Sequence, residues 1–276
     1  MFIIKIMAPS IIFLIPYRNR ELEKLRFSIY MNYILEDYSK NYYEIYYCHQ
    51  CDNREFNRGA TKNIGFLIAK NRYPDNYKDI TFIFNDIDCL PIKKNIVNFD
   101  TSINIIKHIY GFNYTLGGIF SIKGIDYEKC NGFPNNWGWG LEDNVFNARV
   151  LKNKLKIDRT NLHPINSKDI MHFANNKYRL VNNKDIANYV NNKLYDNLDS
   201  ITNLNYDIIE NDEDTNIKLN NQYIINIYHF DTLYKYNKDE FFYKDISKST
   251  QLEYKPQKFN KNDINNRWNM NMYKNK

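Results

Sequence analysis

Hydrophobic residues in the first ninety positions form short apolar runs that alternate with stretches of helical periodicity. Residues 11–15, 42–48 and 80–84 are short runs rich in β-branched or aromatic side chains, which is typical of buried strands. Between these runs, apolar residues recur every three or four positions over 21–38 and 59–70, as they do on the buried face of a helix. The alternation of strands and helices predicts an α/β fold with a parallel central sheet.

Polar residues follow each predicted strand. They occupy residues 18–20, 52–58 and 85–88. In parallel α/β sheets, ligands bind beyond the carboxyl ends of the strands. We therefore expect functional side chains in these three segments.

Glycine is concentrated downstream of Pro91, because seven of the chain's nine glycines lie between residues 111 and 140. Such a concentration indicates backbone that turns sharply or approaches a ligand closely. Helical periodicity returns over 142–155, and beyond residue 236 the chain is mostly Lys, Asn, Asp and Tyr with few aliphatic residues. We expect a single domain over 1–235, followed by a peripheral polar extension over 236–276.

The composition is that of a globular protein without a nucleic-acid-binding surface. Among 276 residues, 43% are hydrophobic, and 38 Lys and Arg outnumber 32 Asp and Glu, which gives a net charge of +6. The basic residues are spread along the chain, whereas a duplex-binding surface requires a dense patch. We therefore expect no nucleic-acid partner.

The N-terminal apolar stretch, residues 1–17, carries Lys5 and Pro16 and is shorter than the roughly 20 residues that span a bilayer. It has no recognisable signal-peptide cleavage pattern. Four cysteines are too few for a disulfide scaffold in a chain of this length. The Cys-x-x-Cys pair Cys48 and Cys51 has no second pair with which to complete a zinc site. We expect a soluble, cytoplasmic protein with no membrane span.

Asp86 and Asp88 follow the predicted strand 80–84, and their carboxylates lie on the same side of an extended backbone. Paired carboxylates can hold Mg²⁺ or Mn²⁺ together with a substrate diphosphate. A solvated turn before Pro91 would explain the same residues. The pair alone leaves both interpretations open.

The segment 131–143 gives this pair a chemical context. Trp137 and Trp139 lie among glycines, directly before Glu142 and Asp143, which open the next predicted helix. Acids in a first helical turn often only complement the helix dipole. Two indoles among glycines, however, are poor core residues and a good platform for the apolar face of a sugar. A carboxylate beside such a platform can act as a general base on a hydroxyl.

Several segments resemble, in the same order, the motifs of the beta-1,4-galactosyltransferase family: 15–20, 56–58, 84–88, 117–121 and 131–143. The segment 199–209 is similar to a strand region near the C-terminus of that family. The resemblance runs from about residue 11 to about residue 230, and the Trp-Gly-Trp-Gly-Leu-Glu-Asp sequence at 137–143 is its most specific element.

The resemblance implies a GT-A glycosyltransferase fold, with a Rossmann-like, mostly parallel central sheet flanked by helices. It implies an inverting enzyme that moves galactose or N-acetylgalactosamine from a UDP-sugar to a sugar hydroxyl of a glycan acceptor, with Mn²⁺ or Mg²⁺ as cofactor. Animal members are usually membrane-anchored Golgi enzymes with disulfides. This chain lacks both features, which favours a cytoplasmic setting such as a microbe or a virus-infected cell.

The resemblance also assigns donor binding to particular residues. Arg18 and Arg20 would contact the uridine diphosphate, as suits guanidinium geometry. The other donor-binding residues would be Phe56, Arg58, Asp86, Thr115, Gly118 and Trp139. Of these, Phe56 and Arg58 would line the nucleotide pocket, and Asp86 would reach the ribose.

The metal ligands implied by the resemblance are Asp88 and His172. The family has a Met-x-x-His pattern where this chain has Asp169 in the Met position and Met171 just before His172. Asp169 is therefore a third candidate ligand. As an oxygen donor, it would favour Mn²⁺ or Mg²⁺ over softer metals.

The catalytic residues implied by the resemblance are Asp143, as general base, and Glu142, which would orient the acceptor. Trp139 would stack on the donor or the acceptor sugar and close the loop over it. Asn144 stands where the family often has a third consecutive acid, and it would also contact the acceptor.

Thr115 falls where the family uses side-chain size to exclude or admit an N-acetyl group on the donor. A small residue leaves room for this group, so we expect UDP-N-acetylgalactosamine to be accepted at least as well as UDP-galactose. Two departures from the family pattern lie nearby, a shortened segment between Gly111 and Gly117 and the absence of a lysine just before it.

Two other classes of protein are alternatives to the enzyme interpretation. A non-catalytic module that binds sugars or nucleotide sugars would keep the aromatic platform and lose turnover, but the presence of Asp88, Glu142, Asp143 and His172 argues against it. A nucleic-acid-binding protein would need a clustered basic patch, which the sequence lacks.

Overall fold

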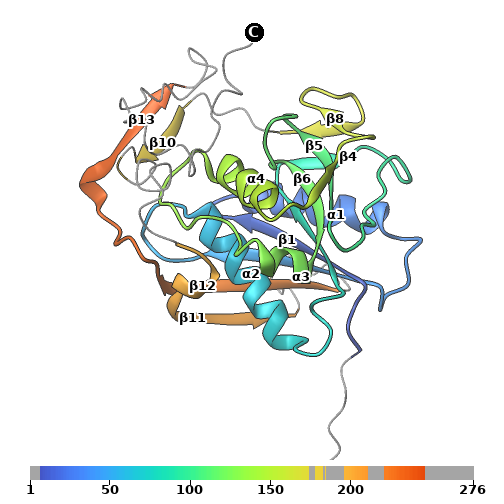
Figure 1. Ribbon diagram of the computed structural model, residues 1–276, viewed down its shortest axis with the longest axis horizontal. Helices are drawn as coiled ribbons and strands as arrows, with labels where there is room; N and C mark the ends of the chain where they lie inside the picture. Colours follow the sequence, from blue (N-terminus) through green and yellow to red (C-terminus); the bar gives the residue numbers. More distant parts are fainter. Residues whose placement is uncertain (1–6, 174–177, 183, 185–195, 211–220, 246–276) are drawn as a thin grey trace, which may run out of the picture.

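The structure is a computed structural model that describes residues 7–173, 178–182, 184, 196–210 and 221–245. Its central element is a nine-stranded mixed sheet (Figure 1). At the middle of the sheet, β1 (Ile11–Tyr17) pairs in parallel with β2 (Tyr43–Gln50) on one side and with β3 (Thr81–Asn85) on the other. These are the three strands predicted from the apolar runs.

The sheet extends on both sides of these strands. On one side, β12 (Gln222–Asp231) pairs in parallel with β2, and β11 (Thr202–Ile209) forms the antiparallel edge. On the other side, β6 (Ile119–Lys123) runs antiparallel to β3, and β5 (Ile105–Gly111) runs antiparallel to β6. Two short strands, β7 (Lys156–Asp158) and β8 (His163–Pro164), then pair with β5 in parallel.

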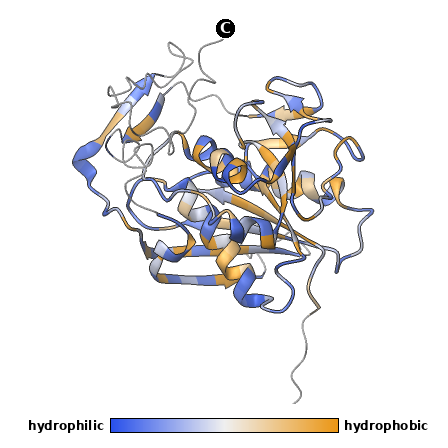
Figure 2. Cartoon of the chain, viewed as in Figure 1, coloured by the Kyte–Doolittle hydropathy of each residue, from blue (hydrophilic) through white to orange (hydrophobic). Residues whose placement is uncertain are grey.

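Helices cover both faces of the sheet, so β1 is buried on both sides. Ile12 and Leu14 face the apolar cluster of α2 (Arg58–Arg72), whereas Ile11, Phe13 and Ile15 face that of α1 (Glu21–Ile34). Two further helices, α3 (Gly124–Lys129) and α4 (Glu142–Lys152), pack on the α2 side. Hydrophobic residues concentrate in the central strands, while the surrounding loops are mainly hydrophilic (Figure 2). The expected mostly parallel α/β sheet flanked by helices is confirmed. None of the described helices is long and apolar enough to cross a membrane.

Two short ribbons lie outside the main sheet. In one, β4 (Cys89–Pro91) pairs with β9 (Ile170–His172). In the other, β10 (Tyr178–Asn182) pairs with β13 (Phe241–Asp245). Two 3-10 turns, η1 (Leu198–Ser200) and η3 (Lys238–Glu240), complete the described elements. Of the predicted extension 236–276, the described residues include η3 and β13, which pairs with β10.

A buried histidine fixes the loop between β5 and β6. His108 is 1% exposed, and the Nε of Arg159 donates to its Nδ1 over 3.1 Å. The proton therefore lies on Nε2, which donates to the carbonyl oxygen of Gly117 over 3.1 Å. Burial and the nearby Arg159 charge lower the pKa of His108 to about 4. The neutral imidazole thus holds the glycine pair at 117–118, which borders the candidate site.

Stability should fall as this histidine is forced to ionise. In the unfolded chain its pKa is about 6.5, so between pH 6.5 and 4 the unfolded state binds more protons than the folded state. The free energy of unfolding should therefore drop by about 2 kcal/mol between pH 7 and pH 5 through this group alone. Urea unfolding of the wild type and of His108→Gln, which keeps a donor and an acceptor but does not titrate, would measure the difference. Equal pH dependence in the two proteins would contradict this account.

Candidate active site

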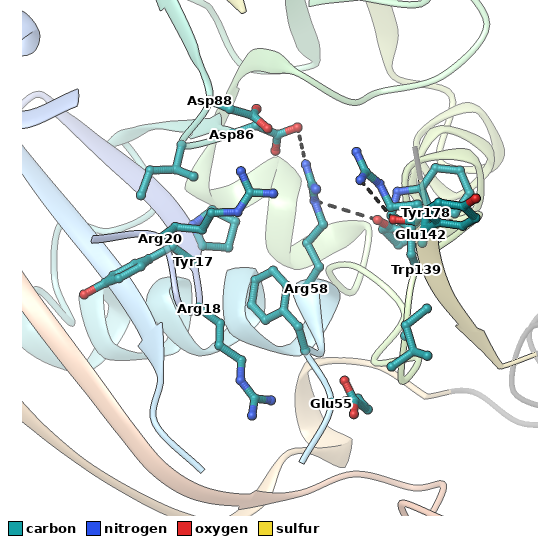
Figure 3. A pocket seen from close by; sticks show the side chains of 16 residues that line it. Tyr17, Arg18, Arg20, Glu55, Arg58, Asp86, Asp88, Trp139, Glu142 and Tyr178 are labelled. Carbon is teal, nitrogen blue, oxygen red and sulfur yellow. Dashed lines mark hydrogen bonds and ion pairs between the residues drawn. The ribbon is translucent and has the colours of Figure 1, made fainter. Parts of the chain in front are cut away.

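A cleft opens at the ends of β1 and β3, and most of the residues predicted to bind substrate line it (Figure 3). The predicted residues on the cleft are Arg18, Arg20, Phe56, Arg58, Asp86, Asp88, Trp139 and Glu142. The cleft also has lining residues that were not predicted: Pro16, Tyr17, Glu55, Ile87, Gly138, Tyr178, Arg179 and Leu180. The polar segments that follow the predicted strands thus meet at one place.

Arg58 links two sides of the cleft. It is the first residue of α2, whose N-terminus is capped by the side chain of Asn57, which accepts from the Ala60 amide over 2.9 Å. Its guanidinium forms an ion pair with Asp86 and lies 3.7 Å from Oε1 of Glu142 (Figure 3). Burial lowers the pKa of Arg58, but the surrounding carboxylates outweigh burial and raise it.

Three polar side-chain atoms on the cleft, one of them Nε of Arg58, are buried without a hydrogen-bond partner among the described residues. Nη1 of Arg18 and Oδ1 of Asp86 are buried and have no hydrogen-bond partner among the described residues. Burial raises the pKa of Asp86, but Arg58 and then Lys62 outweigh this and keep the pKa below its ordinary value. An ionised carboxylate with one unused oxygen can accept from a ligand hydroxyl, and an unused guanidinium nitrogen can donate to an anion.

Asp88, which lines the cleft, and His172, the two metal ligands predicted from the sequence, lie close together. Oδ1 of Asp88 lies 3.8 Å from Nε2 of His172. The Sγ of Cys89 joins them, and the three potential ligand atoms all lie within 4.8 Å of one another. Pairing of β4 with β9 sets this arrangement, because Cys89 is directly opposite His172. One carboxylate, one imidazole and one thiol form a donor set that fits a divalent metal ion.

Asp169 is not brought to this cluster. It lies at the opposite end of β9 from His172, and its Oδ2 is 3.4 Å from Nδ1 of His163. Its backbone carbonyl accepts from the Ile92 amide, which continues the β4–β9 pairing. In this arrangement, the third potential ligand beside Asp88 and His172 is Cys89.

The two tryptophans have different environments, so the expectation that both form a sugar platform is wrong for Trp137. Trp137 is 1% exposed and stacks on Phe230 with ring centroids 5.3 Å apart. Its indole N–H donates to the Thr232 hydroxyl and the Tyr234 carbonyl. Trp139 is only partly buried and lines the cleft. One indole is a core residue and the other is available to a ligand.

Glu142 and Asp143 open α4 and have different partners. Glu142 is 4% exposed, and its Oε2 accepts from the Gly140 amide over 3.0 Å. Burial and then the adjacent Asp143 raise the pKa of Glu142, against the opposing charges of Arg58 and Lys62. The Asp143 side chain is 25% exposed, and its Oδ1 accepts from Nζ of Lys62 over 3.2 Å.

The glycine pair 117–118 leaves space for these acids. A Cβ on Gly117 would lie 2.3 Å from Oδ2 of Asp143, so any side chain there would displace the carboxylate. Gly118 has a φ of +72°, and its carbonyl accepts from the Asp86 amide over 3.0 Å. The pair therefore fixes the backbone between Asp86 and Asp143.

Thr115 and Asn144 do not line the cleft. Thr115 is 6% exposed, and its carbonyl accepts from Nη2 of Arg159. Leu116, the next residue, donates its amide to the carbonyl of Asp143 over 3.4 Å. Asn144 is partly buried in the first turn of α4. Both residues adjoin the Asp143 region rather than the open part of the cleft.

Three functional candidates were not found from the sequence. Lys62 is 1% exposed and lies on the buried face of α2, four residues before Phe66. A lysine at an apolar position of a predicted helix is unusual, and this is the sequence feature that could have identified it. Cys89 directly follows Asp88, but nothing in the sequence showed that it faces His172. Arg179 reaches the cleft on β10, which pairs with the distant strand β13, and this pairing has no local sequence signature.

Two family models match adjacent parts of the chain. Residues 6–99 match the model described as the N-terminal region of glycosyl transferase group 7. Residues 98–174 match the model described as the N-terminal domain of galactosyltransferase. Together they cover the chain from before β1 to just after β9.

Curated relatives match about half of the chain. Xylosylprotein 4-beta-galactosyltransferase of Caenorhabditis elegans is 35% identical over 156 residues, which are 53% of this chain and 52% of the relative. Beta-1,4-galactosyltransferase 4 of Rattus norvegicus is 34% identical over 157 residues, which are 53% of this chain and 44% of the relative. The chain thus spans about half the length of the curated relatives it matches.

Solved structures extend the likeness to most of the chain. The catalytic domain of Drosophila beta-1,4-galactosyltransferase 7, in complex with xylobiose, is 26% identical with a TM-score of 0.62, over 80% of this chain and 94% of that one. A D211N mutant of the Drosophila protein, in complex with manganese, UDP-Gal and xylobiose, is 24% identical and has the same TM-score over the same shares, which shows a common fold. The chain therefore belongs to the beta-1,4-galactosyltransferase family and has its GT-A fold.

Proposed function

We propose that this chain is a metal-dependent, inverting glycosyltransferase that moves galactose or N-acetylgalactosamine from a UDP-sugar to a hydroxyl of a glycan acceptor. The observation that carries the proposal is the cleft itself. It joins Asp88, beside His172, to the partly buried charges of Arg58 and Asp86 and to the buried Glu142. Such a combination of cations, a potential metal site and a shielded carboxylate suits the transfer of a sugar from a diphosphate leaving group.

Donor binding is assigned to the β1 and α2 side of the cleft. Arg18 and Arg20 bind the diphosphate, and Phe56 lines the nucleotide pocket with Arg58. Asp86 accepts from a ribose hydroxyl. The unused Nη1 of Arg18 and the unused Oδ1 of Asp86 support these two roles.

Metal binding is assigned to Asp88 and His172, with Cys89 as the third donor in place of Asp169. When bound, Mn²⁺ or Mg²⁺ would neutralise the charge that builds on the departing UDP. The mutual distances of the three donor atoms support this set. The imidazole and the carboxylate suit Mn²⁺, whereas the thiol would also bind softer metal ions.

Chemistry is assigned to the start of α4. Asp143 takes the proton from the acceptor hydroxyl while that oxygen attacks the anomeric carbon and the bond to UDP breaks on the opposite side. A single displacement inverts the configuration at this carbon. The buried ammonium of Lys62 holds the Asp143 carboxylate in place. Glu142 and Asn144 contact the acceptor, and Trp139 stacks on a sugar ring.

The names of the relatives guide the choice of acceptors. One relative is a xylosylprotein galactosyltransferase, and a solved relative is in complex with xylobiose. Xylosides therefore join N-acetylglucosamine and glucose as acceptors to try.

The function is tested by UDP release with Mn²⁺ across UDP-galactose, UDP-N-acetylgalactosamine, UDP-glucose and UDP-N-acetylglucosamine with these acceptors. Release with one donor, lost in Asp88→Ala, is the expected result. A protein that binds UDP but releases none with any donor would be a binding module instead of an enzyme.

Replacing the general base should abolish most turnover while sparing donor binding. We expect Asp143→Asn to lower kcat by about 10² to 10⁴, the usual contribution of a general base, with UDP affinity unchanged. Steady-state kinetics and calorimetric titration with UDP would measure the two effects. Near-normal turnover in Asp143→Asn would show that another group takes the proton.

Removing a metal ligand should weaken metal affinity directly. Asp88→Ala should reduce Mn²⁺ affinity by roughly tenfold or more, since even the outer-shell partners of metal ligands contribute 10- to 100-fold. Free Mn²⁺ measured by electron paramagnetic resonance reports this without turnover. Asp169→Ala is the matched control and should bind Mn²⁺ as the wild type does. A loss in Asp169→Ala equal to that in Asp88→Ala would restore Asp169 as a ligand.

Donor choice should respond to the size of residue 115. On the proposed function, the donor's N-acetyl group would lie beside Asp143, in the region that Thr115 adjoins. Thr115→Tyr should therefore lower kcat/KM for UDP-N-acetylgalactosamine relative to UDP-galactose by roughly tenfold, because a phenol ring would fill that space. Kinetics with both donors give the ratio. A wild type that strongly prefers UDP-galactose would refute the expectation that the small side chain admits the larger donor.

A further inference from the structure

The two cysteines of the Cys-x-x-Cys sequence point to opposite faces of the sheet. Cys48 is fully buried on the α2 side, where its Sγ donates to the Tyr46 carbonyl and a Cβ on Gly65 would lie 2.5 Å away from it. Cys51 directly follows β2 and is only partly buried. Its amide donates to the Ile227 carbonyl over 2.8 Å, which continues the pairing of β2 with β12. Residues three positions apart in extended chain face opposite ways, so the two thiols do not face one another.

Cys51 instead lies beside a histidine and an asparagine. His49, two residues earlier, is on the same face of the strand, and Asn226 of β12 is directly opposite it. The Sγ of Cys51 is 3.3 Å from Nδ1 of His49 and 3.6 Å from Oδ1 of Asn226. The same Nδ1 and Oδ1 are 3.2 Å apart. A sulfur, a nitrogen and an oxygen atom thus form a small triangle on two paired strands.

The dimensions of this triangle suit a tetrahedral metal ion. Around Zn²⁺, with bonds of about 2.3 Å to sulfur and about 2.0 Å to nitrogen or oxygen, neighbouring ligand atoms lie about 3.3 to 3.5 Å apart. The spacings between Cys51, His49 and Asn226 are close to these values. A thiolate and an imidazole together favour Zn²⁺ and similar ions over Mg²⁺ and Mn²⁺, which prefer oxygen ligands.

Metal binding at this triangle requires protons to move. In the metal-free chain, Nδ1–H of His49 donates to Oδ1 of Asn226. Burial lowers the pKa of His49, so the ring is neutral, and moving its one proton to Nε2 frees the Nδ1 lone pair. Burial raises the pKa of Cys51, so the thiol holds its proton until the metal displaces it to solvent as the sulfur–metal bond forms.

Neighbouring strands orient the imidazole and add a negative charge. Tyr17 of β1, which lines the cleft (Figure 3), is opposite His49, and the two rings stack with centroids 4.4 Å apart and planes 13° from parallel. On the other side, Asp207 of β11 is opposite Asn226. The charge of Asp207 acts on the neighbouring thiol more strongly than the opposing charge of Arg18. A carboxylate near the triangle favours a cation there.

We propose that His49, Cys51 and Asn226 form a second metal site, which takes Zn²⁺ or a similar thiol-binding ion and links β12 to the end of β2. The site is distinct from the candidate metal site at Asp88 and does not depend on the proposed function. Strand β12 lies beyond residues 6–174, which match the family models. The ion would therefore join the C-terminal strands to the matched part of the chain.

The test is titration of the full chain with Co²⁺, which substitutes for Zn²⁺ and gives a thiolate-to-metal absorption band in the near ultraviolet. Cys89→Ala serves as the parent protein, because it removes the thiol of the candidate metal site at Asp88. The parent should show the band, and added Zn²⁺ should abolish it. Cys51→Ala in this parent should give no band. Cys48→Ala is the matched control from the same Cys-x-x-Cys sequence and should retain the band.

The other two ligands are tested by affinity in the same parent. His49→Gln should weaken Co²⁺ binding by roughly tenfold or more, since even a residue that only supports a metal ligand contributes 10- to 100-fold. Asn226→Asp should bind Co²⁺ more tightly than the parent, because its carboxylate places a negative charge next to the cation. Cys51→Ser keeps the size of the side chain and should also lose the band. Far-ultraviolet circular dichroism shows that each variant is folded.

The link between the strands is tested by hydrogen exchange. Zn²⁺ should slow the exchange of backbone amides in β12 of the Cys89→Ala parent, because opening this strand would break the site. The Cys89→Ala, Cys51→Ala double variant should exchange at the same rate with and without Zn²⁺.

Each part of the proposal can fail separately. A Cys89→Ala parent without the band, or a band that survives Cys51→Ala, would refute the site. Loss of the band in folded Cys48→Ala would assign the metal to the two cysteines and overturn the role of His49 and Asn226. Co²⁺ binding through Cys51 with no effect of Zn²⁺ on exchange in β12 would overturn the link between the strands.

Discussion

The partly buried guanidinium of Arg58 is the charge on which the rest of the site depends. A cation taken out of water is tolerated only when carboxylates and hydrogen bonds surround it. Asp86 and Glu142 supply these carboxylates, one from the exit of β3 and the other from the first turn of α4. Three segments distant in the sequence are thereby brought into one arrangement. Asp88 and Asp143, the proposed metal ligand and base, are each within two residues of these carboxylates.

Local patterns were sufficient to predict the framework of the fold. The three central strands are buried on both faces, so they appear in the sequence as continuous apolar runs, and the polar ends of β1 and β3 identified the edge where the cleft lies. Strands β5 and β6 were not predicted, because they lie in the glycine-rich region where the periodicity is irregular. Their places are set by antiparallel pairing with each other and with β3.

The burial and position of individual side chains depend on contacts between segments that are distant in the sequence, and the spacing of residues along the chain does not show these contacts. Trp137 and Trp139 stand in nearly identical local sequence, yet Trp137 is buried because Phe230 and the hydrogen-bond acceptors beside it come from residues more than ninety positions later. Lys62 and Arg179 are similar cases. Each is placed at the site by contacts with a segment that is distant in the sequence, so the residues near Asp143 and on β10 could be found only in three dimensions.

The geometry of the candidate metal site depends on the register in which β4 pairs with β9. Cys89 and His172 are opposite each other in an antiparallel ladder, so the spacing of the donor atoms is set by backbone hydrogen bonds and not only by the reach of side chains. A slip of one residue would turn His172 to the other face of the ribbon and leave Asp88 without its partner. Metal affinity therefore reports whether two short strands, some eighty residues apart in the sequence, have docked in the correct register.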